Sequence, residues 1–359
     1  MSPTAVEFAQ SGLVGGRTAQ IVDGGSVECH AYDVAPLEEG KVRIRTVQSA
    51  VSPGTEMTFL GASPSNPYLR RHWDPDLRLF IDGAPSMQYP ISFGYRAAGE
   101  VVESADTSVP VGHRVYGSWK HTEFTQLPVA QALQQTLPAE LSWADGVDIG
   151  QMGPICVNAV CFAGGEHRGA PVVVFGAGPV GLITAQVARA DGASKVYVVD
   201  RLPKRLEFAA ALGLEPIEAG PDVDVARMLK SRHGSEGIPV AFEATGNASA
   251  LNEAIRVVRR LGLVVAVGFY QGDAVGLKLG DEFHHNGIRV VCGQIGNLHP
   301  TMTWDALRAR TLELALTGKL VLGGLSRLVV PIEQVARGFE ALSRPAEVLQ
   351  VAIDYPARP

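Results

Sequence analysis

Three glycines between two apolar stretches are the residues of this sequence whose types and spacing most directly predict chemistry. The apolar stretch 172–175 runs into the pattern Gly-x-Gly-x-x-Gly at 176–181. An apolar segment at 182–188 follows, and a second apolar stretch, 196–200, ends in an aspartate. This order predicts a strand, a tight turn, a helix and a second strand.

Each glycine has a physical role in such a turn. Gly176 permits the sharp bend, Gly178 lets the backbone approach a pyrophosphate, and Gly181 lets the helix pack closely on the strand. The first turn of the helix then offers unpaired N–H groups to the phosphate oxygens. Asp200 follows the last glycine by 19 residues, a spacing typical of dinucleotide-binding turns. The pattern therefore favours dinucleotide binding over the alternative, a glycine turn that binds no ligand.

The acid at the end of the second apolar stretch distinguishes the two nicotinamide dinucleotides. The Asp200 carboxylate can accept hydrogen bonds from a ribose diol and would repel a 2′-phosphate, so NAD(H) is favoured over NADP(H). Arg201 and Arg205 keep the alternative open, because guanidinium groups nearby can bind a phosphate. They are otherwise solvated residues at the start of a helix, with Arg205 close to the cofactor ribose.

The composition is that of a folded protein without a nucleic-acid-binding surface. At 359 residues, two domains are the usual organisation. A hydrophobic share of 46% suits a large core, and a net charge of −6 argues against nucleic acid as a partner. Residues 1–20 contain no long apolar run, so we expect neither a signal peptide nor a membrane anchor, and a cytoplasmic location.

The chain before the glycine turn has the pattern of a small β-barrel followed by a helix. Residues 42–47 predict a half-buried strand, and 91–102 and 111–117 predict two more. Residues 144–162 predict a helix that leads to the turn. The stretch 61–90 is long, irregular and rich in proline and arginine, which is typical of a binding segment or of a surface loop.

After Asp200, one helix-like segment is followed by three apolar stretches. Residues 205–212 predict a helix, whereas 240–246, 262–269 and 288–293 predict buried strands. This order of elements implies a parallel, doubly wound sheet. The predicted fold class is α/β, with a β-rich domain preceding the parallel sheet.

The order of these elements and several motifs resemble the medium-chain dehydrogenase/reductase superfamily over nearly the whole chain. The matching pieces are Gly-Ala-Gly-Pro-Val-Gly at 176–181, Val-Asp at 199–200, Glu-Ala-Thr-Gly at 243–246, Val-Gly at 267–268, Gly-His-Arg-Val at 112–115 and Gly-Tyr-Arg-Ala-Ala-Gly at 94–99. The resemblance implies a GroES-like catalytic domain at 1–152, a Rossmann NAD-binding domain at 153–295 and a return to the catalytic domain at 296–359. It also implies a homodimer that pairs through the edge strand 288–292.

The resemblance also implies the residues around the nicotinamide. Residues 267–269 would flank the ring, 293–295 would contact its carboxamide, and Trp119 would line the substrate pocket, although Trp119 by itself fits a barrel core equally well. The complete set of expected cofactor-binding residues is Gly176, Gly178, Pro179, Val180, Gly181, Asp200, Arg201, Arg205, Thr245, Val267, Gly268, Phe269, Gln294 and Ile295.

The positions that hold zinc ligands in zinc-dependent members carry other residue types here. They are Ser52, Tyr95 next to Arg96, and Gln151 or a neighbour. A hydroxyl, a phenol and an amide make a poor zinc site. We therefore expect no zinc, and the Ser-Pro-Gly-Thr-Glu and Gly-Tyr-x-Ala-x-Gly pieces are similar to a zinc-less branch that includes bacteriochlorophyllide dehydrogenase-like proteins.

Without a metal, hydrogen-bond donors must stabilise the charge on the reacting oxygen. Tyr95 is the first candidate, with a phenol pKa that a neighbouring cation such as Arg96 could lower. The alternative is a barrel-facing aromatic whose hydroxyl binds backbone. Ser52, Glu56 and Gln151 are further catalytic candidates, each also explicable as structural.

Three functions are compatible with these patterns. The first is an NAD-dependent, zinc-independent dehydrogenase or ketone reductase for a polar secondary alcohol, anionic if Arg70, Arg71 and Arg78 face the pocket. Arg96 is a further expected residue of this substrate pocket. The second is a zinc-less enoyl or quinone reductase using NADPH. The third is a nucleotide-binding protein, or a lyase or epimerase that retains NAD without net redox chemistry.

Overall fold

The parallel sheet expected in the second half of the chain is present in the computed structural model. The structure describes residues 15–61, 65–323, 325, 327–344 and 346–356. The chain divides into two compact units, unit 1 with the described residues of Met1–Gln151 and Ser326–Pro359, and unit 2 with those of Met152–Leu325. The boundary expected at 152 lies at this division, whereas the return segment expected from 296 is split by it.

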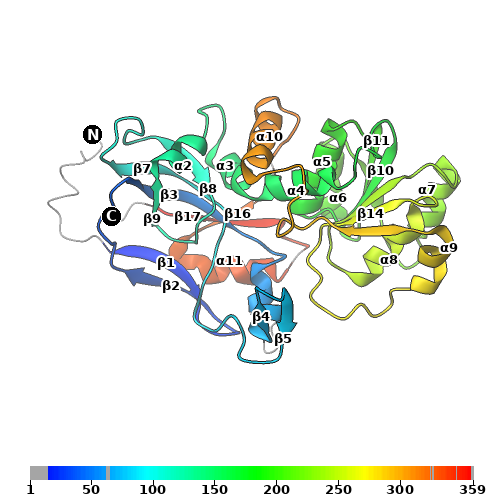
Figure 1. The fold of residues 1–359 in the computed structure, drawn as a ribbon, viewed down its shortest axis with the longest axis horizontal. Coiled ribbons are helices and arrows are strands. Elements are labelled where there is room, and N and C mark those ends of the chain that lie inside the picture. The colour runs from blue at the N-terminus through cyan, green and yellow to red at the C-terminus, as the bar shows by residue number, and fades with distance from the viewer. Residues whose placement is uncertain (1–14, 62–64, 324, 326, 345, 357–359) are drawn as a thin grey trace. The chain divides into compact units, whose positions relative to one another are not determined.

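Six parallel strands form the sheet of unit 2, in the order β12-β11-β10-β13-β14-β15. Figure 1 labels β10, β11 and β14 of this sheet. Their bounds are β10 (Pro171–Phe175), β11 (Lys195–Asp200), β12 (Glu215–Glu218), β13 (Val240–Glu243), β14 (Leu263–Ala266) and β15 (Arg289–Cys292). The chain starts in the middle at β10, moves outward through β11 and β12, and resumes on the other side of β10 at β13. Open α/β sheets bind ligands at the carboxyl ends of the strands beside such a reversal.

Seven helices of the described part accompany this sheet. They are α4 (Met152–Cys161), α5 (Pro179–Ala190), α6 (Pro203–Ala211), α7 (Val225–His233), α8 (Ala248–Val257), α9 (His284–Asn286) and α10 (Trp304–Leu316). Side chains of alternate strand residues such as Val173 and Tyr197 pack with Leu229 of α7 and Ile255 of α8 in one apolar core. Helix α10 packs on α4, and so residues 304–316 belong to unit 2.

Strand β3 (Lys41–Val51) organises unit 1. It pairs antiparallel with β7 (Ala97–Ser104), β9 (Phe124–Pro128) and β17 (Gln350–Asp354), and the last of these brings the C-terminal segment into the barrel. The other elements of unit 1 are β1 (Gly16–Ile21), β2 (Val27–Tyr32), β4 (His72–Asp74), β5 (Leu79–Ile81), β6 (Ile91–Ser92), β8 (Arg114–Gly117), α2 (Val129–Gln134), α3 (Trp143–Gly150), β16 (Arg327–Pro331) and α11 (Val335–Leu342).

The structure corrects three expectations. The stretch 61–90 is not wholly irregular, because β4 and β5 form a hairpin in which Trp73 and Phe80 pack with ring centroids 4.9 Å apart. The helix expected over 144–162 is two helices, α3 and α4, which are separated at Gln151 with φ −145°. Strand β15 is largely exposed rather than buried, because it is the edge strand and, among the described strands, pairs with β14 alone.

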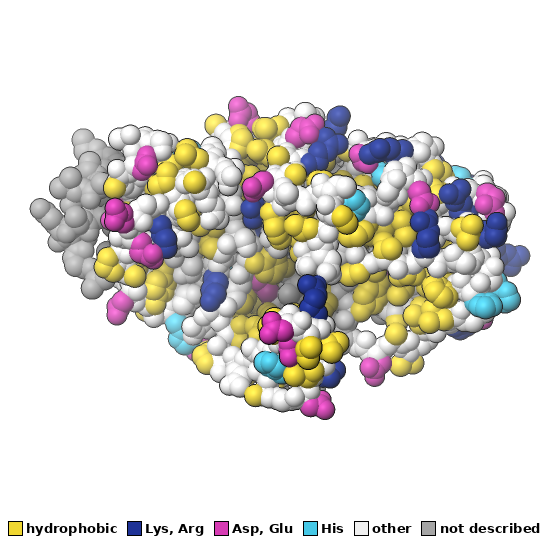
Figure 2. All heavy atoms as spheres, viewed as in Figure 1, with side chains coloured by type: hydrophobic (Ala, Val, Ile, Leu, Met, Phe, Trp, Pro, Cys, Tyr) yellow, Lys and Arg dark blue, Asp and Glu magenta, His cyan; other side chains and the backbone are white. Residues whose placement is uncertain are grey.

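The described surface carries charges of both signs. On the face drawn in Figure 2, Lys and Arg side chains are interspersed with Asp and Glu side chains. Among the helices of the described residues, none has the length and apolar character needed to cross a membrane.

Candidate active site

The glycine turn of unit 2 has the geometry that its residue types predict. Gly176 has φ +103°, a value that favours glycine, and a Cβ on Gly181 would lie 1.8 Å from the Gly176 carbonyl oxygen. Helix α5 begins at Pro179 with Gly178 as its N-cap, and no side chain caps its first N–H groups. These free donors, aligned with the positive end of the helix dipole, fit a pyrophosphate.

Gly178 offers a test of this turn, because its role concerns a ligand rather than the fold. A Cβ on Gly178 would meet only the Arg205 Nη1 atom, at 3.8 Å. We therefore expect Gly178→Ala to leave the melting temperature unchanged and to weaken NADH binding by about tenfold or more, equivalent to about 1.4 kcal/mol. Fluorescence titration measures the affinity, with Gly272→Ala as the control, since a Cβ there meets nothing within 4 Å. Unchanged NADH affinity in Gly178→Ala would contradict the assignment.

Asp200 lies beside this turn, as the spacing predicts. Its Oδ2 accepts a hydrogen bond of 2.7 Å from Ala177 N, and its Oδ1 accepts one of 2.9 Å from Leu202 N. From the end of β11, the carboxylate therefore stabilises the glycine turn through a hydrogen bond. Arg205 is close by, and burial lowers the pKa of its guanidinium against the opposing charge of Asp200. Arg201, in contrast, is exposed.

Glu243 is a central residue of this region that the sequence reasoning did not assign to the site. It is fully buried at the end of β13, where its Oε1 accepts from Thr245 N and its Oε2 from Gly246 N and the Tyr270 hydroxyl. Burial raises the pKa of its carboxyl group despite these hydrogen bonds. In the sequence, Glu243 could have been recognised as an acidic residue at the end of an otherwise apolar predicted strand.

The same residue holds the loop after β14. The Glu243 carbonyl oxygen accepts from Val267 N at 2.7 Å and from Gly268 N at 2.8 Å. The Gln294 side chain donates to the Val267 carbonyl oxygen. The residues expected at 245, 267–269 and 294 are therefore gathered in unit 2, at the carboxyl ends of β13, β14 and β15.

In unit 1, three of the expected catalytic residues lie together. Glu56 is buried and its Oε2 accepts from Ser52 N at 2.7 Å, and the half-buried Tyr95 phenol hydrogen-bonds with the side chains of Ser52 and Thr55. Burial, reinforced by the Glu56 carboxylate, raises the pKa of the Tyr95 phenol. Arg96 lowers the pKa of this phenol, as expected, but its effect is smaller than the effects of burial and Glu56, so the net shift is upward.

Arg96 is not a substrate-binding residue, contrary to expectation. Its side chain is fully buried, with Nη1 2.5 Å from Asp148 Oδ1 and further hydrogen bonds to the Ala50 and Val51 carbonyl oxygens. Arg327 binds the second oxygen of Asp148. The guanidinium of Arg96 therefore joins α3 to the barrel strands.

The structure does not bring the other expected residues to this cluster. Trp119 belongs to an apolar core of unit 1, with its Nε1 donating to Thr46 Oγ1 at 2.9 Å, which corrects its expected role in the pocket. Arg70 and Arg71 are exposed, and Arg71 binds the Phe80 carbonyl oxygen within the 61–90 segment. Gln151 is half-buried at the end of unit 1.

The donor set at the positions matched to zinc ligands does not fit zinc. A serine hydroxyl, a phenol engaged with Ser52 and Thr55, and an amide replace the thiolate, imidazole and carboxylate groups that zinc prefers. Within the described residues, no group of three or more His, Cys, Asp or Glu side chains could hold a metal ion.

Comparison with known proteins finds similarity to dehydrogenases. A model described as zinc-binding dehydrogenase matches residues 179–310, which run from α5 to α10 and include none of Ser52, Tyr95 and Gln151. A D-guloside 3-dehydrogenase of Shigella flexneri is 27% identical over 308 residues, covering 80% of this chain and 85% of the relative. An (R,R)-butanediol dehydrogenase of Bacillus subtilis (strain 168) is 29% identical over 238 residues, 58% of this chain and 66% of the relative.

A solved structure shares the fold. The crystal structure of 2R,3R-butanediol dehydrogenase from Bacillus subtilis superposes with a TM-score of 0.75 at 20% identity, covering 95% of this chain and all of that one. The glycine turn and the strand order are therefore accompanied by similarity to zinc-binding dehydrogenases over 179–310 and to named dehydrogenases over most of the chain, and the chain is an alcohol dehydrogenase or reductase.

Proposed function

We propose that this chain is an NAD-dependent, zinc-independent oxidoreductase that transfers a hydride between nicotinamide and a polar secondary alcohol or ketone. The observation that carries the proposal is the Asp200 carboxylate, bonded to the glycine turn through Ala177 N at the end of β11. A carboxylate in that place favours a free ribose diol over a 2′-phosphate. The relatives named for a guloside and a butanediol support a substrate with more than one hydroxyl group.

The proposed chemistry divides between cofactor and protein. The nicotinamide supplies or accepts the hydride. The Tyr95 phenol supplies the proton to the oxygen of the reduced carbonyl. A phenol is protonated at neutral pH, and burial shifts the pKa of this one further upward. Ser52 and Thr55 orient the phenol, while Glu56 holds the Ser52 backbone. No step requires a metal, because Tyr95 takes the role of polarising the oxygen.

Replacing Asp200 with asparagine is expected to change cofactor preference. The variant keeps the size of the side chain but loses the charge, so NADH affinity should fall by about 10-fold to 100-fold, since a hydrogen bond to a charged group contributes about 1.5–3 kcal/mol. NADPH affinity should rise at the same time, because the repulsion of its 2′-phosphate is removed. Glu218→Gln, at the end of the neighbouring strand β12, is the matched control. If Asp200→Asn had the same ratio of NADH to NADPH affinity as the unchanged protein, Asp200 would not determine which cofactor is bound.

The first experiment is a titration of the metal-analysed protein with NADH and NADPH, followed by assays with polyols and ketones. Tight NADH binding without zinc supports the proposal. Stoichiometric zinc contradicts it. A clear NADPH preference would assign Arg205 to the 2′-phosphate and favour an enoyl or quinone reductase, whereas NADH binding without any turnover would favour a protein that retains NAD without net redox chemistry.

A homodimer in the cytoplasm is part of the proposal. Strand β15 is at the edge of the sheet and exposes Val290 and Cys292, which supports pairing with a second copy. All four cysteines are free thiols, as expected in a reducing compartment. Light scattering of the purified protein tests the dimer, and a monomeric mass would contradict it.

A further inference from the structure

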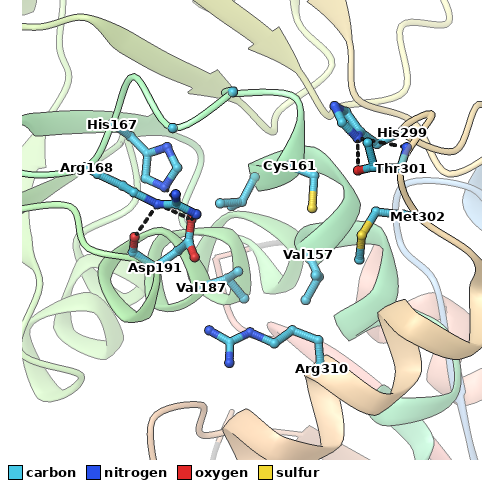
Figure 3. A pocket seen from close by; sticks show the side chains of 13 residues that line it. Val157, Cys161, His167, Arg168, Val187, Asp191, His299, Thr301, Met302 and Arg310 are labelled. Carbon is cyan, nitrogen blue, oxygen red and sulfur yellow. Dashed lines mark hydrogen bonds and ion pairs between the residues drawn. The ribbon is translucent and has the colours of Figure 1, made fainter.

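A cavity of about 360 Å³ lies within unit 2 (Figure 3). Its walls come from α4, the loop at 164–168, the C-terminal half of α5 and the segment 299–310. No residue of the glycine turn lines it, and it faces the opposite end of α5 from the pyrophosphate-binding N-terminus. Its volume is within the range of small-molecule sites.

One part of the cavity is apolar. Val157 and Val160 of α4, Val187 of α5 and Met302 contribute aliphatic and thioether surface. Figure 3 shows the sulfur atoms of Cys161 and Met302 on the same side of it. Burial raises the pKa of the Cys161 thiol, which therefore stays uncharged and adds to this apolar surface. A ligand here needs an apolar body.

The other part carries an excess of positive charge. Arg168 and Arg310 line the cavity with a single carboxylate, Asp191, which Arg168 Nη2 binds at 3.0 Å. His167 donates from Nε2 to the same carboxylate at 2.9 Å, and burial lowers its pKa so that it remains neutral. The two arginines and the one carboxylate of the lining therefore carry a net charge of one positive unit.

The Arg310 guanidinium is available to a ligand. Its Nη1 pairs with Glu313 at 2.8 Å on the exposed face of α10, an interaction that contributes little when solvated. Its remaining N–H groups have no hydrogen-bond partner among the described residues, and a guanidinium presents two parallel donors to a carboxylate. In Figure 3 the Arg310 side chain extends along the cavity towards the side of Val187.

We propose that this cavity is a second binding site, separate from the dinucleotide, for a small organic anion with an apolar body and one carboxylate. The apolar body lies against the valines and Met302, and the carboxylate pairs with Arg310 and with the Arg168 groups that Asp191 leaves free. This proposal does not depend on the hydride-transfer function.

The test uses 4-fluorobenzoate as the probe and follows its ¹⁹F signal with the full chain in the presence of NADH. We expect saturable binding in the millimolar range, with 4-fluorobenzyl alcohol, its neutral analogue, binding about tenfold more weakly. Arg310→Gln and Arg168→Gln should each weaken 4-fluorobenzoate binding by about tenfold. Arg344→Gln, which removes an exposed charge paired with Glu340 and Glu347 in unit 1, should leave it unchanged.

The ion pairs of Arg168 with Asp191 and of Arg310 with Glu313 are partly exposed, so their loss should not unfold the protein. Melting temperatures of all variants check that each one is folded. Any of three results would overturn the proposal. 4-Fluorobenzoate and 4-fluorobenzyl alcohol could bind equally well, 4-fluorobenzoate could show no saturable binding, or Arg310→Gln could bind it with the same affinity as the unchanged protein. Competition of the probe with the alcohol substrate would place it at the catalytic residues instead, and would also overturn it.

Discussion

Replacing Tyr95 with phenylalanine is expected to lower the rate of carbonyl reduction by about 10² to 10⁴ while NADH affinity stays the same. The variant removes only the hydroxyl that we assign as the proton donor. The phenyl ring is retained, so packing near Glu56 and Thr55 changes little. Steady-state kinetics with saturating NADH measure the loss in kcat, and the fluorescence titration measures the affinity.

The pH profile gives this prediction a second readout. Because burial raises the pKa of the Tyr95 phenol, its acid form persists to higher pH than that of a free tyrosine, and the rate of reduction should fall only above about pH 10. Tyr89→Phe is the matched control, since the Tyr89 hydroxyl donates to the Phe59 carbonyl oxygen in the same unit. A Tyr95→Phe variant with the turnover of the control would show that the phenol is structural.

Replacing Asp148 with asparagine is expected to destabilise unit 1 by about 3–5 kcal/mol, the usual effect of breaking a buried ion pair. Asp148 is fully buried and is the carboxylate that binds both Arg96, also fully buried, and Arg327. The amide would keep one acceptor and lose the charge. The fully buried Arg96 guanidinium would then lose the carboxylate that pairs with it.

Urea unfolding followed by circular dichroism measures this free energy. Glu340→Gln is the control, because Glu340 is an exposed acid of the same unit that pairs with Arg344, and its loss should cost no more than about 1 kcal/mol. A cost for Asp148→Asn as small as that of Glu340→Gln would mean that water or another group compensates the arginines.

Local sequence patterns predicted the glycine turn and the parallel strands of unit 2. The glycines of 176–181, Asp200 and the alternating apolar stretches lie close together in sequence, and the structure has the turn, the helix and the parallel strand order that they predict. The reason is that each feature depends on backbone geometry or on burial within a few residues. Glu243 and Tyr270 were missed as partners, because 27 residues separate them and no periodic pattern links them.

In unit 1 the roles of individual side chains depended on distant partners. Arg96 stands beside Tyr95 in sequence, yet its guanidinium pairs with Asp148, 52 residues away, while Arg327 reaches the same carboxylate over 179 residues. Trp119 likewise bonds with Thr46 across 73 residues and packs in the core. Adjacency in the sequence indicated a catalytic cation next to a phenol, and tertiary packing gave that cation a structural partner.

The sequence by itself determined the glycine turn, the parallel sheet and the acid at the end of β11, since all of these follow from residue identity and short-range spacing. Only the tertiary structure decided which polar groups are buried together, because desolvation and ion pairing depend on which distant strands and helices meet. For this reason Arg96 and Trp119 are buried in the core of unit 1 rather than in the predicted substrate pocket, and the net shift of the Tyr95 pKa is upward.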